Sequence, residues 1–221
     1  MPKPSRPERR APALGEVPMS ESLRGLAARG KATLYRKGRE LIREGTPGDS
    51  LFIILSGRLR AYSANEDDTH RVTFGEYLPG EFLGEMSLDG GMRSASVEAA
   101  VASWCVVIAR PTLERHIAED PAFAFELLGK VIRRARAASL SLRTIAFNDV
   151  YGRVVWLLNS RALPRPDGSR VVGPISQQEV ADWLACNRSM VSRVMTALER
   201  GGYLRAEGRS IVLTKTLPAR F

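Results

Sequence analysis

The chain of 221 residues contains only two cysteines, Cys105 and Cys186, and only two histidines. Two cysteines cannot build a disulfide framework, a cysteine-rich metal site or an iron–sulfur centre, so those classes are excluded. No apolar run is long enough to span a membrane, and no apolar stretch follows the basic residues near the start, as a secretory signal requires. The composition therefore predicts a cytoplasmic protein without a membrane partner.

Acidic residues are also scarce, because 24 Asp and Glu stand against 33 Lys and Arg, which gives a formal net charge of +9. A basic excess favours polyanionic partners such as nucleic acid, although a solvated basic surface gives the same composition. We find no catalytic dyad, no Gly-rich phosphate loop and no metal motif, so no enzyme is predicted. The length suits one or two domains.

The chain divides into four segments by composition and period. Residues 1–22 are rich in Pro and Arg and poor in apolar side chains, which predicts a disordered tail. Residues 23–120 contain β-rich runs at 50–62, 70–78 and 94–109, separated by turn residues such as Pro47 and Gly48. Many short strands with regular turns predict a small antiparallel barrel or roll.

Residues 121–147 have the pattern of one long helix. Pro111 and Pro121 suit first-turn positions of helices, and Asp120 suits an N-cap. Apolar residues then follow at alternating spacings of four and three, which is a heptad seam. The seam predicts a parallel homodimer, and the alternative is packing of this helix against its own barrel. The seam positions are Ala124, Leu128, Val131, Ala135, Ala138, Leu142 and Ile145.

The segment 148–221 predicts a helix-turn-helix with a wing. Asp149 can cap a helix after the break at "FND". Ser176 and Glu179 match a capping box that opens another helix, and Asn187 suits the N-cap of the next one. That helix has an apolar inward face of Val191, Val194, Met195 and Leu198. Its outward face carries Arg188, Ser189, Ser192, Arg193 and Thr196, which suit DNA bases and phosphates.

Two short strands around Glu207 and Gly208, with arginines at 205 and 209, follow this helix and predict the wing. Residues 148–221 contain eleven Arg or Lys and six Asp or Glu, a net charge of +5. This charge is consistent with binding to DNA phosphates. A helical hairpin without a DNA function is the alternative.

With these segments in this order, the chain resembles the CRP/FNR family of transcription regulators, to which the catabolite activator protein belongs. The resemblance covers about residues 25–215 and rests on the helix-turn-helix and three further stretches. They are "PGDSLFIILSGRLRAY", "YLPGEFLGEMSLDGGMRSASVEA" and "IAFNDVYGRVV". It implies an α+β architecture: a β-roll ligand-sensing domain at 23–120, a dimerisation helix at 121–147 and a winged helix-turn-helix at 148–221.

The stretch "GEMSLDGGMRSA" matches the cassette of the family's nucleotide-binding members. By resemblance, Glu85 accepts from the ribose 2′-hydroxyl, Arg93 pairs with the cyclic phosphate and Ser94 adds a hydroxyl donor. Gly84 and Met86 complete the cassette, and a short helix starting near Gly84 would present N–H groups to an anion. From the residues alone, a Glu–Arg surface pair explains Glu85 and Arg93 equally well. The resemblance favours a cyclic nucleotide effector, with cAMP or a close relative preferred.

One departure concerns the base of that nucleotide. The family's cAMP-responsive members use a Thr and a Ser of the dimer helix, and the alignment places these positions at Ala138 and Ser139. Ala138 has no hydroxyl, and loss of one neutral hydrogen bond weakens adenine selection by about 0.5–1.5 kcal/mol. The open alternatives are cGMP, a cyclic dinucleotide, or a ligand-independent member of the family. A nucleotide-binding module without a DNA function is a further alternative.

The resemblance also bears on other cofactors and partners. No haem is expected, because His70 lies in a charged turn and His116 on a polar helix face, where both would be exposed. The expected partners are double-stranded DNA with a palindromic operator and a second copy of the chain. In the DNA reader, Ser189 replaces a glutamate of the family, Gln177 stands where Arg is frequent and Ala185 replaces a turn glycine. The turn "LPRPDGSR" lies where the family's activators can touch RNA polymerase.

Overall fold

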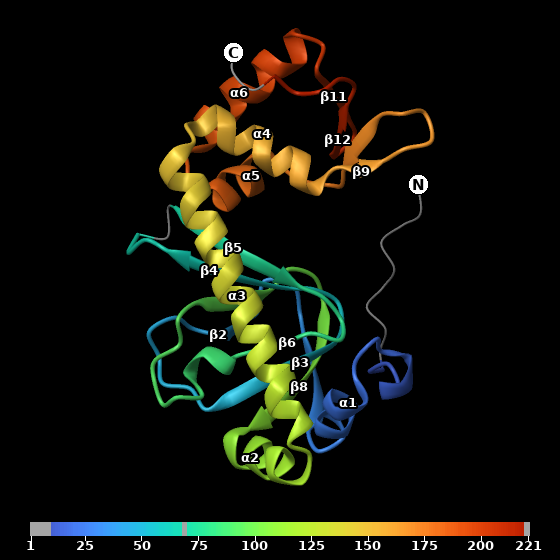
Figure 1. The fold of residues 1–221 in the computed structure, drawn as a ribbon, viewed down its shortest axis with the longest axis vertical. Coiled ribbons are helices and arrows are strands. Elements are labelled where there is room, and N and C mark those ends of the chain that lie inside the picture. Colours follow the sequence, from blue (N-terminus) through green and yellow to red (C-terminus); the bar gives the residue numbers. More distant parts are fainter. Residues whose placement is uncertain (1–9, 68–69, 219–221) are drawn as a thin grey trace. The chain divides into compact units, whose positions relative to one another are not determined.

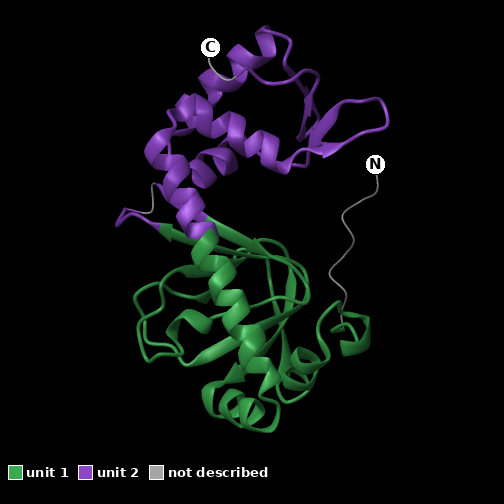
Figure 2. Ribbon diagram, in the orientation of Figure 1, with its two compact units in different colours: residues 1–63, 74–136 green, residues 64–73, 137–221 purple. Residues whose placement is uncertain are grey.

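The computed structural model describes residues 10–67 and 70–218. Its contacts divide the chain into two compact units, which Figure 2 shows in two colours. The first unit comprises residues 1–63 and 74–136, and the second comprises 64–73 and 137–221. The division falls inside the long helix, whereas the sequence placed the domain boundary at residue 148.

Two antiparallel sheets of four strands each form the β-roll (Figure 1). The first has the order β1-β8-β3-β6, with β1 at Lys31–Tyr35, β8 at Ser103–Ala109, β3 at Ser50–Ser56 and β6 at Phe82–Leu83. The second has the order β2-β7-β4-β5, with β2 at Glu40–Ile42, β7 at Ser96–Ala99, β4 at Leu59–Ala64 and β5 at Arg71–Tyr77. The predicted β-roll is confirmed.

The central strand β3 is buried on both faces, which explains why its sequence is apolar without alternation. Leu51 and Ile53 pack into a cluster with Leu23 and Phe123 of the helices. Phe52 and Ile54 turn the other way, into a cluster between the sheets. Cys105 lies in that second cluster, where burial raises the pKa of its thiol to about 12. The roll is therefore a filled core.

Helical segments begin within the predicted tail. A 3₁₀ turn, η1, spans Leu14–Glu16, and α1 spans Glu21–Ala27 with the Ser20 hydroxyl accepting from the Leu23 N–H. Val17, between them, is 3% exposed. The prediction of a disordered tail is therefore wrong for residues 10–22, because apolar side chains among the prolines reach the core. Residues 1–9 lie outside the described part.

The helix α2 spans Arg110–Glu119, with Pro111 in its first turn as predicted. The expected exposure of His116 is wrong, because this side chain is 3% exposed. Its ring lies 5.3 Å from the Phe123 ring, and neither ring nitrogen has a hydrogen-bond partner among the described residues. Asp120 follows as the C-cap of α2, and its carboxylate accepts from the Ser22 hydroxyl at 2.5 Å.

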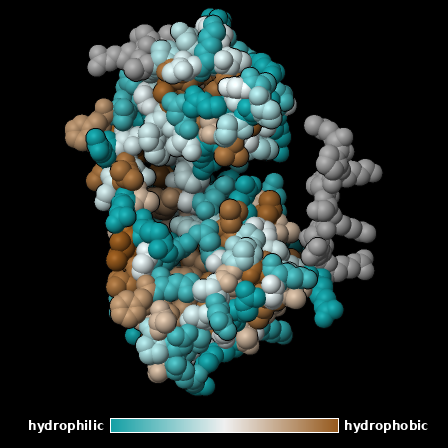
Figure 3. All heavy atoms as spheres, turned by 45° about the vertical axis from the view of Figure 1, so that its right-hand side comes forward, coloured by the Kyte–Doolittle hydropathy of each residue, from teal (hydrophilic) through white to brown (hydrophobic). Residues whose placement is uncertain are grey.

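The long helix α3 spans Ala122–Phe147, as its pattern predicted, and appears in yellow in Figure 1. Phe123 is buried and Leu127 is half-buried on the face that packs against the roll. The opposite face is exposed, and Figure 3 shows apolar side chains reaching the surface among hydrophilic ones. The large exposed apolar side chains of α3 are Phe125, Leu128, Ile132, Leu140, Leu142, Ile145 and Phe147.

The exposed stripe therefore differs in register from the predicted seam over the first half of α3. Phe125 and Ile132 are exposed, whereas the predicted Ala124 and Val131 are half-buried. The reason is that Phe123 and Leu127 turn the helix toward the roll. One face of α3 packs on the roll, as the alternative hypothesis predicted, and the homodimer stays a prediction for the exposed face.

In the second unit, three helices pack around one core with a third sheet. The helices are α4 at Val150–Arg161, α5 at Gln177–Leu184 and α6 at Arg188–Arg200. The sheet has the order β11-β12-β10-β9, with β9 at Leu163–Pro164, β10 at Arg170–Val172, β11 at Leu204–Glu207 and β12 at Ser210–Leu213. Asp149 caps α4 as predicted, accepting from the Gly152 N–H at 2.8 Å. Across the described residues, no helix combines the length and apolar character needed to cross a membrane.

Candidate nucleotide and DNA sites

The cassette "GEMSLDGGMRSA" folds as the loop between β6 and β7. Gly84 adopts a φ of 99°, in the left-handed region that glycine tolerates, and precedes the 3₁₀ turn η2 at Glu85–Ser87. A short helical turn near Gly84 is thereby confirmed. Two backbone hydrogen bonds of 2.9 Å, Gly45 N–H to Arg93 and Arg93 N–H to Thr46, hold the far end of the cassette. Glu85 and Arg93 are both buried, at 5% and 7% exposure.

Arg93 is a buried cation held by neutral oxygens. Its guanidinium donates to the carbonyls of Gly84 and Ser50, each at 2.9 Å, and to the Ser50 hydroxyl at 3.0 Å. Within the described residues, no carboxylate forms a salt bridge with it. Burial lowers the pKa of Arg93, and the negative charges of Asp49 and Glu85 act in the opposite direction. A desolvated cation with only neutral partners is stabilised by an anion.

Glycine is needed at two positions beside this guanidinium. A Cβ at Gly48 would lie 1.9 Å from Arg93 Nε, and a Cβ at Gly84 would lie 2.9 Å from one of its terminal nitrogens. The two glycines therefore make the space that Arg93 occupies.

The structure adds a residue to this site that sequence reasoning missed. Arg134 of α3 forms an ion pair with Glu85 Oε1 and donates to the Phe82 carbonyl at 2.6 Å. The Glu85 side chain is fully buried, and its second oxygen, Oε2, has no hydrogen-bond partner among the described residues. Helical periodicity could have found Arg134, because it lies eleven residues after Phe123 on the face that packs against the roll.

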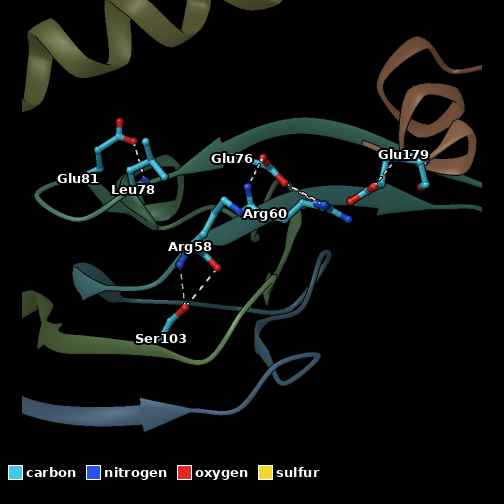
Figure 4. Close-up of polar contacts among 8 residues, drawn as sticks. Arg58, Arg60, Glu76, Leu78, Glu81, Ser103 and Glu179 are labelled. Carbon is cyan, nitrogen blue, oxygen red and sulfur yellow. Dashed lines mark hydrogen bonds and ion pairs between the residues drawn. The ribbon is translucent and has the colours of Figure 1, made fainter. Parts of the chain in front are cut away.

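A second ion pair lies one helical turn before Arg134. Lys130 pairs with Glu81, whose other oxygen accepts from the Leu78 N–H at 2.8 Å (Figure 4). Nearby on the roll, Glu76 lies between Arg58 and Arg60 in the same view. The pairs at Lys130 and Arg134 fix α3 against the loop that carries the cassette.

The remaining predicted ligand residues lie at the surface. Met86 is 51% exposed, and Ser94 is also exposed. Ala138 follows Arg134 by four residues, on the same helical face, and Ser139 is exposed next to it. The structure brings Glu85 and Arg93 together with Arg134, and the ligand-binding roles of Glu85, Arg93, Ser94 and Ser139 all stay predictions.

The helix-turn-helix forms as predicted around a shared core. The capping box is present, with Glu179 N–H donating to the Ser176 hydroxyl at 3.1 Å and Ser176 N–H donating to the Glu179 carboxylate at 2.8 Å. Asn187 stands at the N-cap of α6, but its side chain makes no capping bond. Instead, its Oδ1 lies 2.8 Å from Nε2 of His70, which belongs to the same compact unit. The side-chain cap predicted for Asn187 is therefore wrong.

The two faces of α6 separate as predicted. Val191, Met195 and Leu198 are buried in the core of the unit, and Val194 packs against it. A groove on the outer face is lined by Ser192, Arg193, Thr196, Ala197 and Arg200. Arg188, Ser189 and Arg193 are exposed, while Gln177 and Ser192 are half-buried. The outward side chains can therefore meet a surface of DNA phosphates and base edges.

The wing is the hairpin of β11 and β12, which turns at Gly208 with a φ of 63°. Arg205 pairs with Glu207 at 3.2 Å, and Arg165 from the turn after β9 holds the same carboxylate with two contacts of 3.1 Å. These exposed pairs neutralise part of the wing's basic charge. Arg209, in the turn, is exposed.

Ala185 ends α5 in the left-handed region, at φ 50° and ψ 50°, the only non-glycine residue with positive φ among those described. We expect Ala185→Gly to stabilise the protein by about 0.5–1 kcal/mol. Relief of about 1–2 kcal/mol of backbone strain exceeds the greater chain entropy of glycine, about 0.4–1 kcal/mol. Urea unfolding would measure this. Ala197→Gly, inside α6, is the matched control and should destabilise the protein by about 1 kcal/mol; the same sign for both variants would contradict the strain at Ala185.

The comparisons with known proteins agree with both parts of this geometry. The model of the cyclic nucleotide-binding domain matches residues 32–120, and that of the Crp-like helix-turn-helix domain matches residues 152–216. A CRP-like cAMP-activated global transcriptional regulator of Mycobacterium tuberculosis is 29% identical over 185 residues, which cover 81% of this chain and 82% of that protein.

Two further relatives extend the likeness. The cAMP-activated global transcriptional regulator CRP of Salmonella typhimurium is 30% identical over 190 residues, which cover 82% of this chain and 89% of that protein. The solved structure of the c-di-GMP responsive global regulator CLP of Xanthomonas campestris has a TM-score of 0.77 at 24% identity. It covers 88% of this chain and 99% of that one, and this likeness shows the fold. On the identity and coverage of the curated relatives, the chain belongs to the CRP/FNR family of transcription regulators.

Proposed function

We propose that this regulator is a homodimer whose binding to a palindromic operator is controlled by a cyclic nucleotide, cAMP or a close relative, held in the β-roll. The observation that supports the effector is that Oε2 of the fully buried Glu85 side chain has no hydrogen-bond partner among the residues that the structure describes. A buried carboxylate oxygen without a donor is costly, and a hydroxyl of a ligand would satisfy it.

The chemistry of the neighbouring groups fits a cyclic nucleotide. Arg134 holds Glu85 by an ion pair, which leaves Oε2 as the acceptor for a ribose hydroxyl. Arg93 supplies a buried positive charge for the phosphate, and Ser94 supplies an exposed hydroxyl beside it. A bound nucleotide would bring to this site a negative charge and a hydroxyl donor.

The proposed control links this site to DNA through α3. Arg134 is itself a residue of α3, so a ligand at Glu85 acts on a side chain of the helix that we expect to form the dimer. The break at Asn148 and Asp149 separates α3 from α4 and would serve as the hinge. In the dimer, two copies of α6 would then reach half-sites one helical turn of DNA apart.

Calorimetry with cAMP, cGMP and cyclic di-GMP tests the effector directly. We expect saturable binding of a cyclic mononucleotide, and we expect Glu85→Gln to weaken it, because the amide no longer offers a charged acceptor. DNA affinity measured with and without that nucleotide then reports control. Absence of binding for all three nucleotides, with DNA binding intact, would favour the ligand-independent alternative. Binding of cyclic di-GMP alone would favour the cyclic dinucleotide alternative.

The homodimer is proposed from the exposed stripe of α3 and its heptad spacing. We expect Leu142→Glu to convert the dimer to a monomer, because it places a charge in an apolar seam. Sedimentation velocity would measure the change. Leu163→Glu is a matched control, since Leu163 and Leu142 are both 68% exposed and Leu163 lies outside α3. A dimer that survives Leu142→Glu would exclude this part of the helix from the interface.

The turn "LPRPDGSR" stays a proposed contact for RNA polymerase. In the structure it joins β9 to β10 and is tied to the wing through Arg165 and Glu207.

A further inference from the structure

Four side chains of the first unit form a row of neighbours. Arg93 donates to the carbonyl of Gly84, the residue before Glu85, at 2.9 Å. Glu85 is paired with Arg134, and the Arg134 guanidinium lies over the Tyr77 ring at 4.7 Å from its centre. Tyr77 is the last residue of β5 and packs half-buried against the core between the sheets. Sequence reasoning gave Tyr77 no role.

The order of this row corresponds to the order of groups in a cyclic nucleotide. The 2′-hydroxyl of the ribose lies between the ring carbon bonded to the phosphate oxygen and the carbon that carries the base. With the phosphate at Arg93 and that hydroxyl at Glu85, the base would continue toward Arg134 and Tyr77. We propose that Tyr77 is a specificity-determining residue that contacts the base of the effector through its hydroxyl. This inference rests on the proposed function and adds the base to it.

The Tyr77 hydroxyl is available for such a contact. The hydroxyl lies next to Gly75 of the same strand. A Cβ at position 75 would be 3.0 Å from Tyr77 Oη, so glycine leaves space for the phenol. Among the described residues the hydroxyl makes no hydrogen bond. Burial raises the pKa of Tyr77, the charge of Arg134 opposes this, and the charges of Glu85 and Glu81 raise the pKa further. The phenol therefore stays neutral and can either donate to the base or accept from it.

This role would also account for the departure on α3. Ala138 lacks the hydroxyl with which the family's cAMP-responsive members contact the base from this position. Tyr77 would supply a hydroxyl to the base from β5 instead. Arg134 adds a planar cation, which can stack on a base as it stacks on the Tyr77 ring.

The test compares Tyr77→Phe with the wild type by calorimetry against three probes: cAMP, cGMP and a cyclic ribose phosphate that lacks a base. We expect the affinity for the preferred nucleotide to fall about three- to tenfold, the range for one neutral hydrogen bond. The affinity for the probe without a base should not change. Gly75→Ala is a second variant, which keeps the phenol and crowds its hydroxyl, and it should also reduce discrimination between the bases.

Tyr35→Phe is the matched control, because Tyr35 is a half-buried tyrosine on β1 that packs edge-on against Phe52. It should leave the affinities for all three probes unchanged. The proposal is overturned if Tyr77→Phe keeps the wild-type ratio of affinities for the three probes. An equal loss for all of them, including the probe without a base, also overturns it, because Tyr77 would then only shield the ion pair. Failure of the wild type to bind any probe would instead count against the proposed function, and this inference would fall with it.

Discussion

Arg193→Ala is expected to reduce affinity for the operator by about 30-fold to 10⁴-fold while the protein stays folded. Arg193 is exposed on the outer face of α6, in the groove with Ser192 and Thr196. An arginine that contacts guanine with two hydrogen bonds contributes about 1–3 kcal/mol of discrimination. A dimer contains two such contacts, so the expected loss is about 2–6 kcal/mol if they add.

The measurement is fluorescence anisotropy with an operator selected by the wild-type protein and with a scrambled duplex. Arg205→Ala is the control, because Arg205 lies on the wing and is already paired with Glu207. That variant should weaken both duplexes by similar, smaller factors and should lower the salt dependence. The thermal unfolding of Arg193→Ala should match the wild type, since Val191, Met195 and Leu198 hold the helix in the core. An unchanged ratio between operator and scrambled duplex would show that Arg193 reads no base.

The inward and outward faces of α6 could be predicted from sequence because burial of Val191 and Leu198 depends on local helical period alone. The same holds for the capping box at Ser176, whose two hydrogen bonds join residues three positions apart. The hydrogen bond of the Asn187 side chain could not be predicted from neighbouring residues. Its side chain bonds instead with His70, which lies 117 positions earlier in the sequence, and tertiary contacts override local preference.

The candidate nucleotide site also contains residues that local sequence patterns do not predict. Glu85 and Arg93 stand out in one short stretch, and the resemblance of that stretch to a family's cassette predicts roles for them. Arg134 pairs with Glu85 from a distant helix, and Tyr77 lies against Arg134 from the end of another strand, so no spacing within the stretch itself marks either residue. The burial of His116 was missed for a similar reason, because α2 turns that face toward α1 and α3.

Among the substitutions in the roll, we expect that of Arg93 to reduce affinity for the effector most. Arg93→Ala removes the buried cation and should lower affinity for the cyclic nucleotide by about 10-fold to 150-fold, the range for hydrogen bonds to a charged group, about 1.5–3 kcal/mol. It also removes the hydrogen bonds that Arg93 donates to the carbonyls of Gly84 and Ser50, which destabilises the roll by about 1–3 kcal/mol. Loss of binding in this variant alone would therefore leave two explanations.

Gly48→Ala separates the two explanations. The added Cβ would lie 1.9 Å from Arg93 Nε, so the guanidinium must move, although its charge and hydrogen-bonding groups are kept. We expect reduced nucleotide affinity with a smaller loss of stability than in Arg93→Ala. Arg29→Ala is the control for charge, because Arg29 forms an exposed pair with Glu119. It should leave nucleotide affinity unchanged.

Operator affinity in the same variants decides whether the roll is a sensor. If a nucleotide controls DNA binding, Arg93→Ala and Gly48→Ala should remove the change in operator affinity that the nucleotide produces, while affinity without nucleotide stays near the wild-type value. The reason is that a ligand shifts an equilibrium only by its difference in affinity between the two states. Anisotropy with and without a saturating nucleotide measures both quantities. A response that persists in both variants would place the effector away from Arg93, and a wild type without any response would make the roll a scaffold.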